Sequence, residues 1–387
     1  MTVKVTDIHS LPVCPSPGTL RSLHPSEQVA AYNHISSTLQ YALSLSDEKL
    51  SKLLCSDFIA SYARGVAAEV LNSIIFPDDA QKSDRKHPTE AIIRKRVLVL
   101  AQRLALLPKA GGLSFQVLLD LCIVFGPKNV TKVRNLLEAA VESDGVLAQE
   151  LQHSAIPVFA SVLISTSNGL HAIRKTVYCI KCLVHCSPPS LLDIMSKNTD
   201  FILAIAKCYD SRLSTIASAY GGINIDSADT DQKMWLYCKI DLMDSFHIIL
   251  KHILKSVQSD PRTHIEHAFD TVFSLLNLPS SSGTNEQVPF LNRSLLADYQ
   301  DSYNLSSSLA SVLANHDDPR LDVLESTLRS FELNLDSDDR KGALRILIRS
   351  SGIPQGIDHR GIGSSGDRKS TRLNSSHSGE SRMPSSA

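Results

Sequence analysis

Residues 113–129, with the sequence LSFQVLLDLCIVFGPKN, constrain the fold more than any other stretch of the chain. Their apolar side chains cover more than half the circumference of a helix, so we predict a core helix that is buried on several sides. These side chains are Val117, Leu118, Leu121, Cys122, Val124 and Phe125. Gly126 and Pro127 then predict a sharp stop, because glycine tolerates a left-handed end and proline cannot continue the helix.

The residues after this stop predict a second helix that packs back against the first. Asn129 can cap it. One side carries Val130, Val133, Leu136, Leu137, Ala140 and Val141, and the other carries Lys132, Arg134 and Glu138. An apolar face opposite a charged face is typical of a helix at the edge of a core. The two segments together predict a helical hairpin.

The whole chain predicts an all-α fold. Strict alternation of apolar and polar residues, the pattern of a half-buried strand, is absent, and apolar residues recur at helical spacing instead. No repeat of constant period is present, so a regular solenoid is not expected. We predict an irregular multi-helix array of helical hairpins in one or two lobes, with an extended N-terminal arm and a disordered C-terminal tail.

The composition of successive stretches suggests where the chain divides. We predict an N-terminal arm over 1–35, helical lobe 1 over 36–218, helical lobe 2 over 219–278 with a long apolar helix at 232–255, a linker and final helices over 279–350, and a connector over 351–366. We favour an arm folded onto its own body over an arm that grips a partner. Residues 367–387 resemble the conceptual translation of a sequencing-library adapter, and we expect this polar tail to be a disordered artefact.

Charge and hydropathy exclude some classes of function. The chain has 39 basic and 40 acidic residues, so no global field draws it to nucleic acid or anionic lipid. No apolar run reaches the about 18 to 20 residues that a membrane span requires. The N-terminus lacks the basic start and apolar stretch of a signal peptide. The 8 cysteines lie mostly in helical patterns, which fits reduced thiols in the cytosol or nucleus.

Candidate reactive residues do not assemble into a known catalytic pattern. Cys179, Cys182 and Cys186 share one face of a predicted helix, with His185 beside them, and we favour a buried thiol face over a zinc site. The 264–267 segment, HIEH, has the wrong spacing for a metalloprotease helix. Phosphate-binding loops and nucleophile elbows are missing from the sequence. We therefore expect a protein that is not an enzyme and that uses no metal or cofactor.

A basic run at Arg94, Lys95 and Arg96 leaves an alternative open. Such clusters can contact phosphates, so a nucleic-acid-binding transcription coactivator module is the second hypothesis. Aromatic residues make up only 5% of the chain, which leaves few platforms for stacking bases. We favour a solvated helix end or an acidic protein partner, and direct binding of nucleic acid is disfavoured.

Several blocks of the sequence, in the same order, resemble the activating signal cointegrator 1 complex subunit 2 family. The blocks are LRSLHP at 20–25 with Tyr32 behind it, SYAR at 61–64, RKRVL at 94–98, LLDLCIVFG at 118–126 followed by Lys128 and Asn129, and LMDSFHIIL at 242–250. Blocks that keep one order are more specific than any single block. The resemblance extends over most of the expected folded region.

The resemblance implies a non-catalytic scaffold. In that family a helical body binds the N-terminal part of a large helicase, and a later CUE domain binds ubiquitin, which links ubiquitin on stalled ribosomes to the helicase. Contact with the ribosome is thus indirect, and the family also acts in DNA alkylation repair and transcription coactivation. A cytoplasmic and nuclear location follows. Partner-binding positions implied here are Leu20, Arg21, His24, Pro25, Tyr32, Arg64, Arg94 and Arg96.

The expected CUE domain is missing from this sequence. Neither its methionine-phenylalanine-proline-like turn nor its late dileucine is present. Residues 353–358, IPQGID, resemble the connector that leads to that domain. We therefore expect a chain truncated before the CUE domain, which binds the helicase but not ubiquitin.

Overall fold

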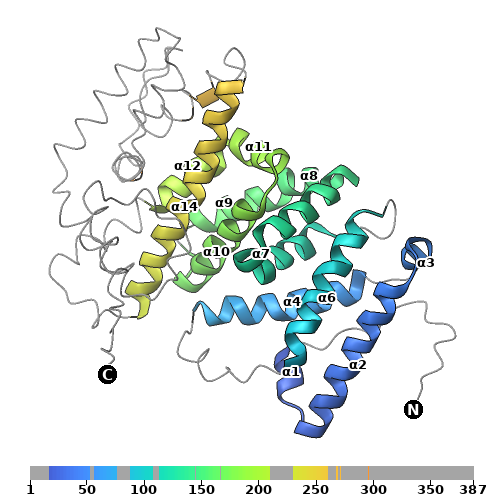
Figure 1. Ribbon diagram of the computed structural model, residues 1–387. Helices are drawn as coiled ribbons and strands as arrows, with labels where there is room; N and C mark the ends of the chain where they lie inside the picture. The colour runs from blue at the N-terminus through green and yellow to red at the C-terminus, as the bar shows by residue number, and fades with distance from the viewer. Residues whose placement is uncertain are drawn as a thin grey trace, which may run out of the picture.

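The computed structural model describes residues 17–52, 56–75, 88–107, 113–143, 145–165, 167–209 and 230–259, together with 267, 268, 271 and 295. Within these ranges every regular element is helical and no residue belongs to a strand. The predicted all-α multi-helix array is confirmed. Figure 1 shows the helices in a layered arrangement, with α7 and α10 between α14 on one side and α6 and α2 on the other.

The described helices differ widely in length. In chain order they are α1 (Pro17–Arg21), α2 (Pro25–Ser44), α3 (Asp47–Lys52), α4 (Ser56–Ser73), α6 (Pro88–Ala105), α7 (Phe115–Ser143), α8 (Val146–Glu150), the π-helix η1 (Leu151–Ala155), α9 (Ile156–Ile164), α10 (Leu170–Cys186), α11 (Pro189–Lys197), α12 (Thr199–Cys208) and α14 (Thr230–Ser259). No helix among these residues is long and apolar enough to cross a membrane.

Helix α7 is the predicted core helix, and it continues further than expected. Most of its predicted apolar positions are buried, although Val124 is only half-buried. The predicted stop at Gly126 is wrong, because helical structure runs through Pro127 and the backbone bends only at Asn129, with φ −140° and ψ 40°. The two halves of α7 therefore meet at a kink and not across a loop.

Gly126 serves close packing rather than a left-handed turn. A Cβ atom placed on it would lie 2.8 Å from the Sγ atom of Cys186 in α10. Real Cβ atoms are not found that close to a neighbouring heavy atom. The glycine thus lets α7 and α10 approach each other in the centre of the core.

The described part of the N-terminal arm is helical and lies on the body. Helix α2 begins at Pro25, so the predicted boundary at residue 35 falls inside it. Leu20, Tyr32 and Ile35 are buried in the main core. Residues 17–35 are thus mostly helical and pack on the body, whereas an extended arm was expected.

Two interruptions divide the helices between Val146 and Cys208. The π-helix η1 ends at Ala155 and leads into α9, which has Pro157 in its first turn. The helical stretch that follows Pro188 is divided into α11 and α12. Asn198 lies between them and accepts a 2.9 Å hydrogen bond from the backbone N–H of Phe201, which caps α12.

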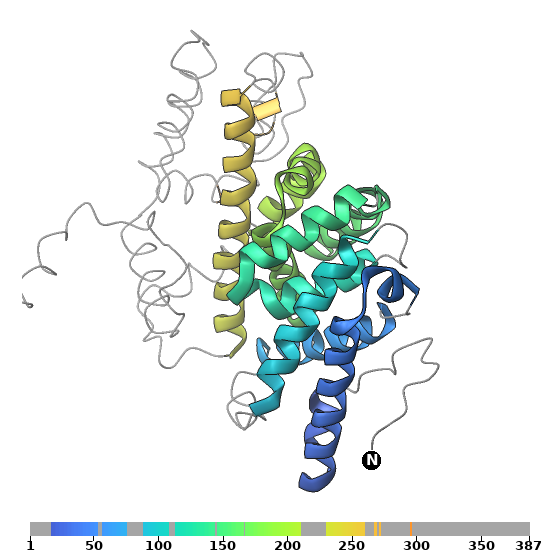
Figure 2. The ribbon, with the colours of Figure 1, turned by 45° about the vertical axis from the view of Figure 1, so that its right-hand side comes forward.

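The long apolar helix predicted at 232–255 is present as α14, which extends slightly beyond both ends. It packs along α10, and Figure 2 shows it standing upright along one side of the helical array. Several predictions lie outside the described residues: residues 1–16, most of the 279–350 segment, the 351–366 connector and the 367–387 tail.

Candidate partner-binding surface

A polar cluster joins three helices from the first third of the chain. Arg21, the last residue of α1, lies 3.2 Å from a carboxylate oxygen of Glu69 in α4 and 3.6 Å from one of Glu90 in α6. Arg94, one turn along α6, donates a 2.9 Å hydrogen bond to the same Glu90 oxygen. Glu90 is buried, so these pairs hold α1, α4 and α6 together.

Leu20 and Tyr32 belong to the interior beside this cluster. Both side chains are buried in the main core. Burial raises the pKa of the Tyr32 hydroxyl, and the nearby carboxylate of Glu90 raises it further. Four of the predicted partner-binding residues, namely Leu20, Arg21, Tyr32 and Arg94, thus make contacts inside this chain.

Arg96 also contacts its own chain, from a half-buried position on α6. Its guanidinium donates hydrogen bonds to the carbonyl oxygen of Ser36 at 2.6 Å, to the Ser36 hydroxyl at 2.5 Å and to the side-chain oxygen of Gln40 at 3.2 Å. Two turns later Arg103 donates to the carbonyl oxygens of Leu43 and Leu45. These bonds fasten α6 along the length of α2.

The remaining predicted positions lie on the surface. His24 and Pro25 are exposed at the start of α2, where a His24 ring nitrogen is 2.9 Å from the Ser26 hydroxyl. Arg64 is exposed on α4. Of the basic run on α6, only Lys95 is fully exposed, because Arg94 and Arg96 turn toward acceptors of the same chain.

Arg64 lies near a buried carboxylate. Asp120 in α7 is buried, and burial raises the pKa of this carboxyl group. A 3.1 Å hydrogen bond from Gln116 and the positive charge of Arg64 act in the opposite direction. The Oδ2 atom of Asp120 has no hydrogen-bond partner among the described residues. Arg64 therefore combines an exposed position with an anionic neighbour.

Sequence reasoning missed a buried charge network between α10 and α14. Asp241 receives a 2.5 Å hydrogen bond from Arg174 on one carboxylate oxygen and one of 2.5 Å from Lys181 on the other. Lys181 also lies 3.8 Å from Asp244. Burial alone would raise the pKa of Asp241, but the two cations outweigh it and hold that pKa below its usual value.

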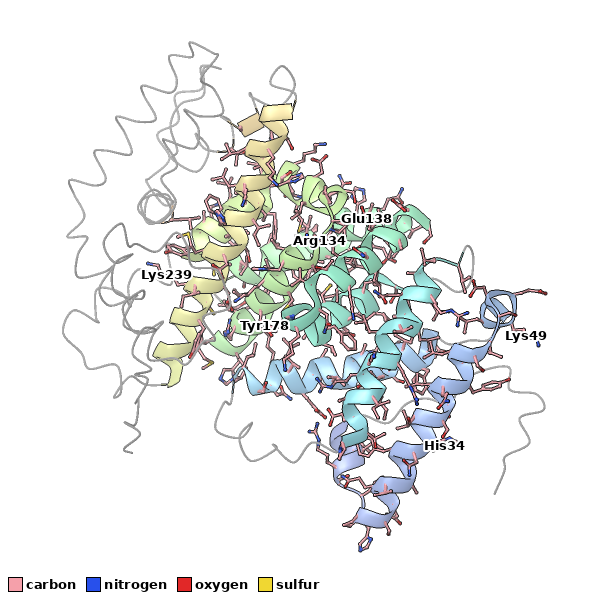
Figure 3. All side chains as sticks on the ribbon, viewed as in Figure 1. His34, Lys49, Arg134, Glu138, Tyr178 and Lys239 are labelled. Atoms are coloured by element: carbon pink, nitrogen blue, oxygen red, sulfur yellow. The ribbon has the colours of Figure 1, made fainter. Side chains whose placement is uncertain are left out.

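Aromatic rings complete this network. The Arg174 guanidinium lies 5.8 Å from the ring centre of Tyr178 and 5.5 Å from that of Tyr237. The Lys239 ammonium lies 4.6 Å from the ring centre of Tyr209. Figure 3 marks Tyr178 beside α10 and Lys239 on the side of α14 that faces away from α7. The sequence signal that could have predicted this network is the presence of charged residues on the otherwise apolar faces of α10 and α14.

The predicted thiol face is buried for Cys182 and Cys186, whereas Cys179 is half-buried. Burial raises the pKa of the Cys179 thiol to about 12. Cys186 shares a hydrogen bond with Cys122 of α7, and this bond and burial raise the pKa of Cys122. The same hydrogen bond lowers the pKa of Cys186. Cys122, Cys182 and Cys186 are buried and pack as small core side chains. No group of three or more histidine, cysteine or acidic residues in the described ranges is placed to hold a metal ion.

Three comparisons with known proteins found no match. These were a scan against models of protein families, a search of curated proteins and a search of solved structures.

Proposed function

We propose that the chain is a non-catalytic scaffold subunit that binds the N-terminal part of a large helicase, as the resemblance to the activating signal cointegrator 1 complex subunit 2 family implies. The observation that carries the proposal is the common order of the resembling blocks, from 20–25 to 242–250. The all-helical core is compatible with a binding role, since helical arrays offer extended surfaces for protein partners.

Arg64 is the residue best suited to contact that partner. Its side chain is exposed on α4, whereas Arg21, Arg94 and Arg96 are committed to acceptors within the chain. A guanidinium can donate two parallel hydrogen bonds to a carboxylate, and such charge-assisted pairs are stronger and more selective than neutral ones. We therefore expect an aspartate or glutamate of the helicase opposite Arg64.

The same proposal extends to the pathway. A CUE domain in the full-length protein would bind ubiquitin, and the scaffold would bring the helicase to ubiquitin-marked stalled ribosomes without itself contacting them. The resemblance also connects the protein with DNA alkylation repair and transcription coactivation, which fits a cytoplasmic and nuclear location.

Calorimetric titration of the chain with the helicase's N-terminal segment tests this proposal. The wild-type chain should form a stable complex, and Arg64→Glu should weaken it by about tenfold or more, which corresponds to about 1.4 kcal/mol. Lys251→Glu provides a matched charge reversal at an exposed position of α14 and should bind like the wild type.

The outcomes are distinct. Absence of binding by the wild-type chain would overturn the proposed function. Equal binding by Arg64→Glu would leave the function standing but would remove Arg64 from the interface. Circular dichroism should show equal helicity for all three proteins, because both substitutions lie on exposed helix faces.

A further inference from the structure

Helix α6 carries a line of apolar side chains that the described helices leave exposed. Ile92, Val99 and Leu106, just past the end of the helix, are 48%, 39% and 68% exposed. They are spaced by seven residues, which is close to two helical turns, so they lie along one side of the helix. Lys95 is exposed between the first two, and we call Ile92, Lys95, Val99 and Leu106 the α6 stripe.

Other exposed apolar side chains in the described residues do not form such a line. Val29 and Tyr41 are twelve residues apart on α2, and Val158 and Ile164 are six residues apart on α9. At about 100° per residue, each pair points in two different directions. Single exposed apolar residues need no explanation, but a line at seven-residue spacing is the pattern of a helix–helix seam.

The α6 stripe has a definite border on each side. Toward α2, Arg96 and Arg103 lean away to bond the carbonyl oxygens of Ser36 and Leu43. Toward α7, Gln102 donates a 3.1 Å hydrogen bond to the carbonyl oxygen of Lys132. Figure 2 shows α6 running diagonally between α2 and the helices of the central layer. The neighbouring helices thus flank the stripe without covering it.

Basic side chains border most of the α6 stripe, with the exposed carboxylate of Asp47 paired to Arg103 near its C-terminal end. Helix α6 has four basic side chains and one acidic side chain, and that one, Glu90, is buried and paired with Arg21 and Arg94. Lys128 and Lys132 are exposed on the adjoining part of α7. A second copy of the chain would bring Lys95 against these same cations. An acidic partner would meet complementary charge instead.

We infer that the α6 stripe docks an amphipathic helix of the helicase segment, one with large apolar side chains at seven-residue spacing and with glutamate or aspartate on its flanks. This inference rests on the proposed function, because the helicase supplies the helix. The apolar line fills the seam between the two helices, and Lys95 pairs with a flanking carboxylate.

Titration of variants of this 387-residue chain with the helicase's N-terminal segment tests the inference. Val99→Glu places a negative charge in the middle of the stripe and should weaken binding by about a hundredfold. Val158→Glu makes the same change at a 59% exposed position of α9 and should leave the affinity unchanged. Lys95→Glu should weaken binding by about tenfold, and Lys251→Glu should not.

Each outcome decides the matter. Loss of binding in Val99→Glu and Lys95→Glu, with both controls unaffected, supports the inference. Wild-type affinity in Val99→Glu overturns it and leaves the proposed function intact, whereas failure of the wild-type chain to bind overturns both. Two further results would overturn the inference by showing another occupant of the stripe. Concentration-dependent dimers that Val99→Glu abolishes would show that a second copy of the chain covers it. A lower midpoint of denaturant unfolding for isolated Val99→Glu than for Val158→Glu would show that the chain itself covers it.

Discussion

The α10–α14 contact and the α2–α6 contact both use an arginine to join helices that are far apart in the sequence, but in different surroundings. Arg174 is 5% exposed and bonds an ionised partner, Asp241. Arg96 is half-buried and bonds neutral acceptors on Ser36 and Gln40. A charge with no access to water depends on its partner, whereas a charge at the rim can turn to water when its partner is lost.

This difference separates charges that are enclosed in the core from charges that water can reach. The α10–α14 network is enclosed, so its contribution is to fix how α14 lies on the core. The α2–α6 bonds are accessible, so their loss should cost less. Neither set is available to a partner without breaking internal contacts, and the exposed Arg64 is therefore the better candidate for binding.

The largest effect of a single substitution at neutral pH is expected from Asp241→Ala. This change leaves the buried Arg174 and the half-buried Lys181 without their shared carboxylate, and it should lower the free energy of unfolding by about 3–5 kcal/mol. Chemical denaturation followed by circular dichroism measures the loss. Asp200→Ala removes an exposed carboxylate from the first turn of α12 and should cost no more than about 1 kcal/mol.

Replacing the whole network separates its charge from its shape. With Asp241→Leu, Arg174→Met, Lys181→Met and Asp244→Asn combined, the paired charges of the network are removed together, and most of the lost stability should return. A quadruple variant as unstable as Asp241→Ala would contradict the account of this contact.

A second effect is expected on acidification. Burial lowers the pKa of His185 in α10 and of His247 in α14 to about 4, against about 6.5 in the unfolded chain. Below about pH 6.5 the unfolded chain binds more protons than the folded one, so stability should fall as the pH drops from about 6.5 to about 4. Asp241, whose pKa is lowered, should contribute its own loss only below that window.

Denaturation curves collected across this pH range measure the effect. The expected size is up to about 1.4 kcal/mol for each unit between the folded and unfolded pKa of a histidine. The double substitution His185→Gln and His247→Gln should flatten the curve between pH 4 and 6.5, in about the interval where the histidines titrate. An unchanged slope would show that these two groups are protonated in the folded protein.

The smallest effect is expected from Arg96→Ala. Its hydrogen bonds to α2 lie at a half-buried position, so their loss should lower the free energy of unfolding by about 1–2 kcal/mol. Arg64→Ala, an exposed position on the neighbouring α4, should change it by no more than about 0.5 kcal/mol. If Arg96→Ala and Arg64→Ala lower the free energy of unfolding equally, Arg96 contributes no more to helix packing than Arg64 does.

Helical periodicity made much of the fold predictable from the sequence. The apolar spacing of Val117, Leu118 and Leu121 predicted the core helix, and the long apolar run at 232–255 predicted α14. The same spacing was present at Tyr32, Ile35, Leu39 and Ala42, so α2 could have been extended back to Pro25, a residue favoured at a helix start. Asn198 gave a capping signal that the surrounding apolar pattern obscured.

The contacts between distant residues could not be predicted in this way. Gly126 has the sequence context of a helix end, but its role depends on Cys186 of another helix. The pairing of Arg174 with Asp241, 67 positions further along the chain, is likewise set by packing and not by local spacing. For the candidate site, the sequence named candidate arginines but could not show which of them face water.

The central claim is that exposed rather than internally bonded charges of this helical scaffold bind a helicase. Parallel titrations of the helicase's N-terminal segment into the wild-type chain and the Arg64→Glu variant test it most directly. The account predicts a stable wild-type complex and a loss of affinity of about tenfold or more in Arg64→Glu with unchanged helicity. Undiminished affinity of Arg64→Glu, or no complex with the wild-type chain, would contradict it.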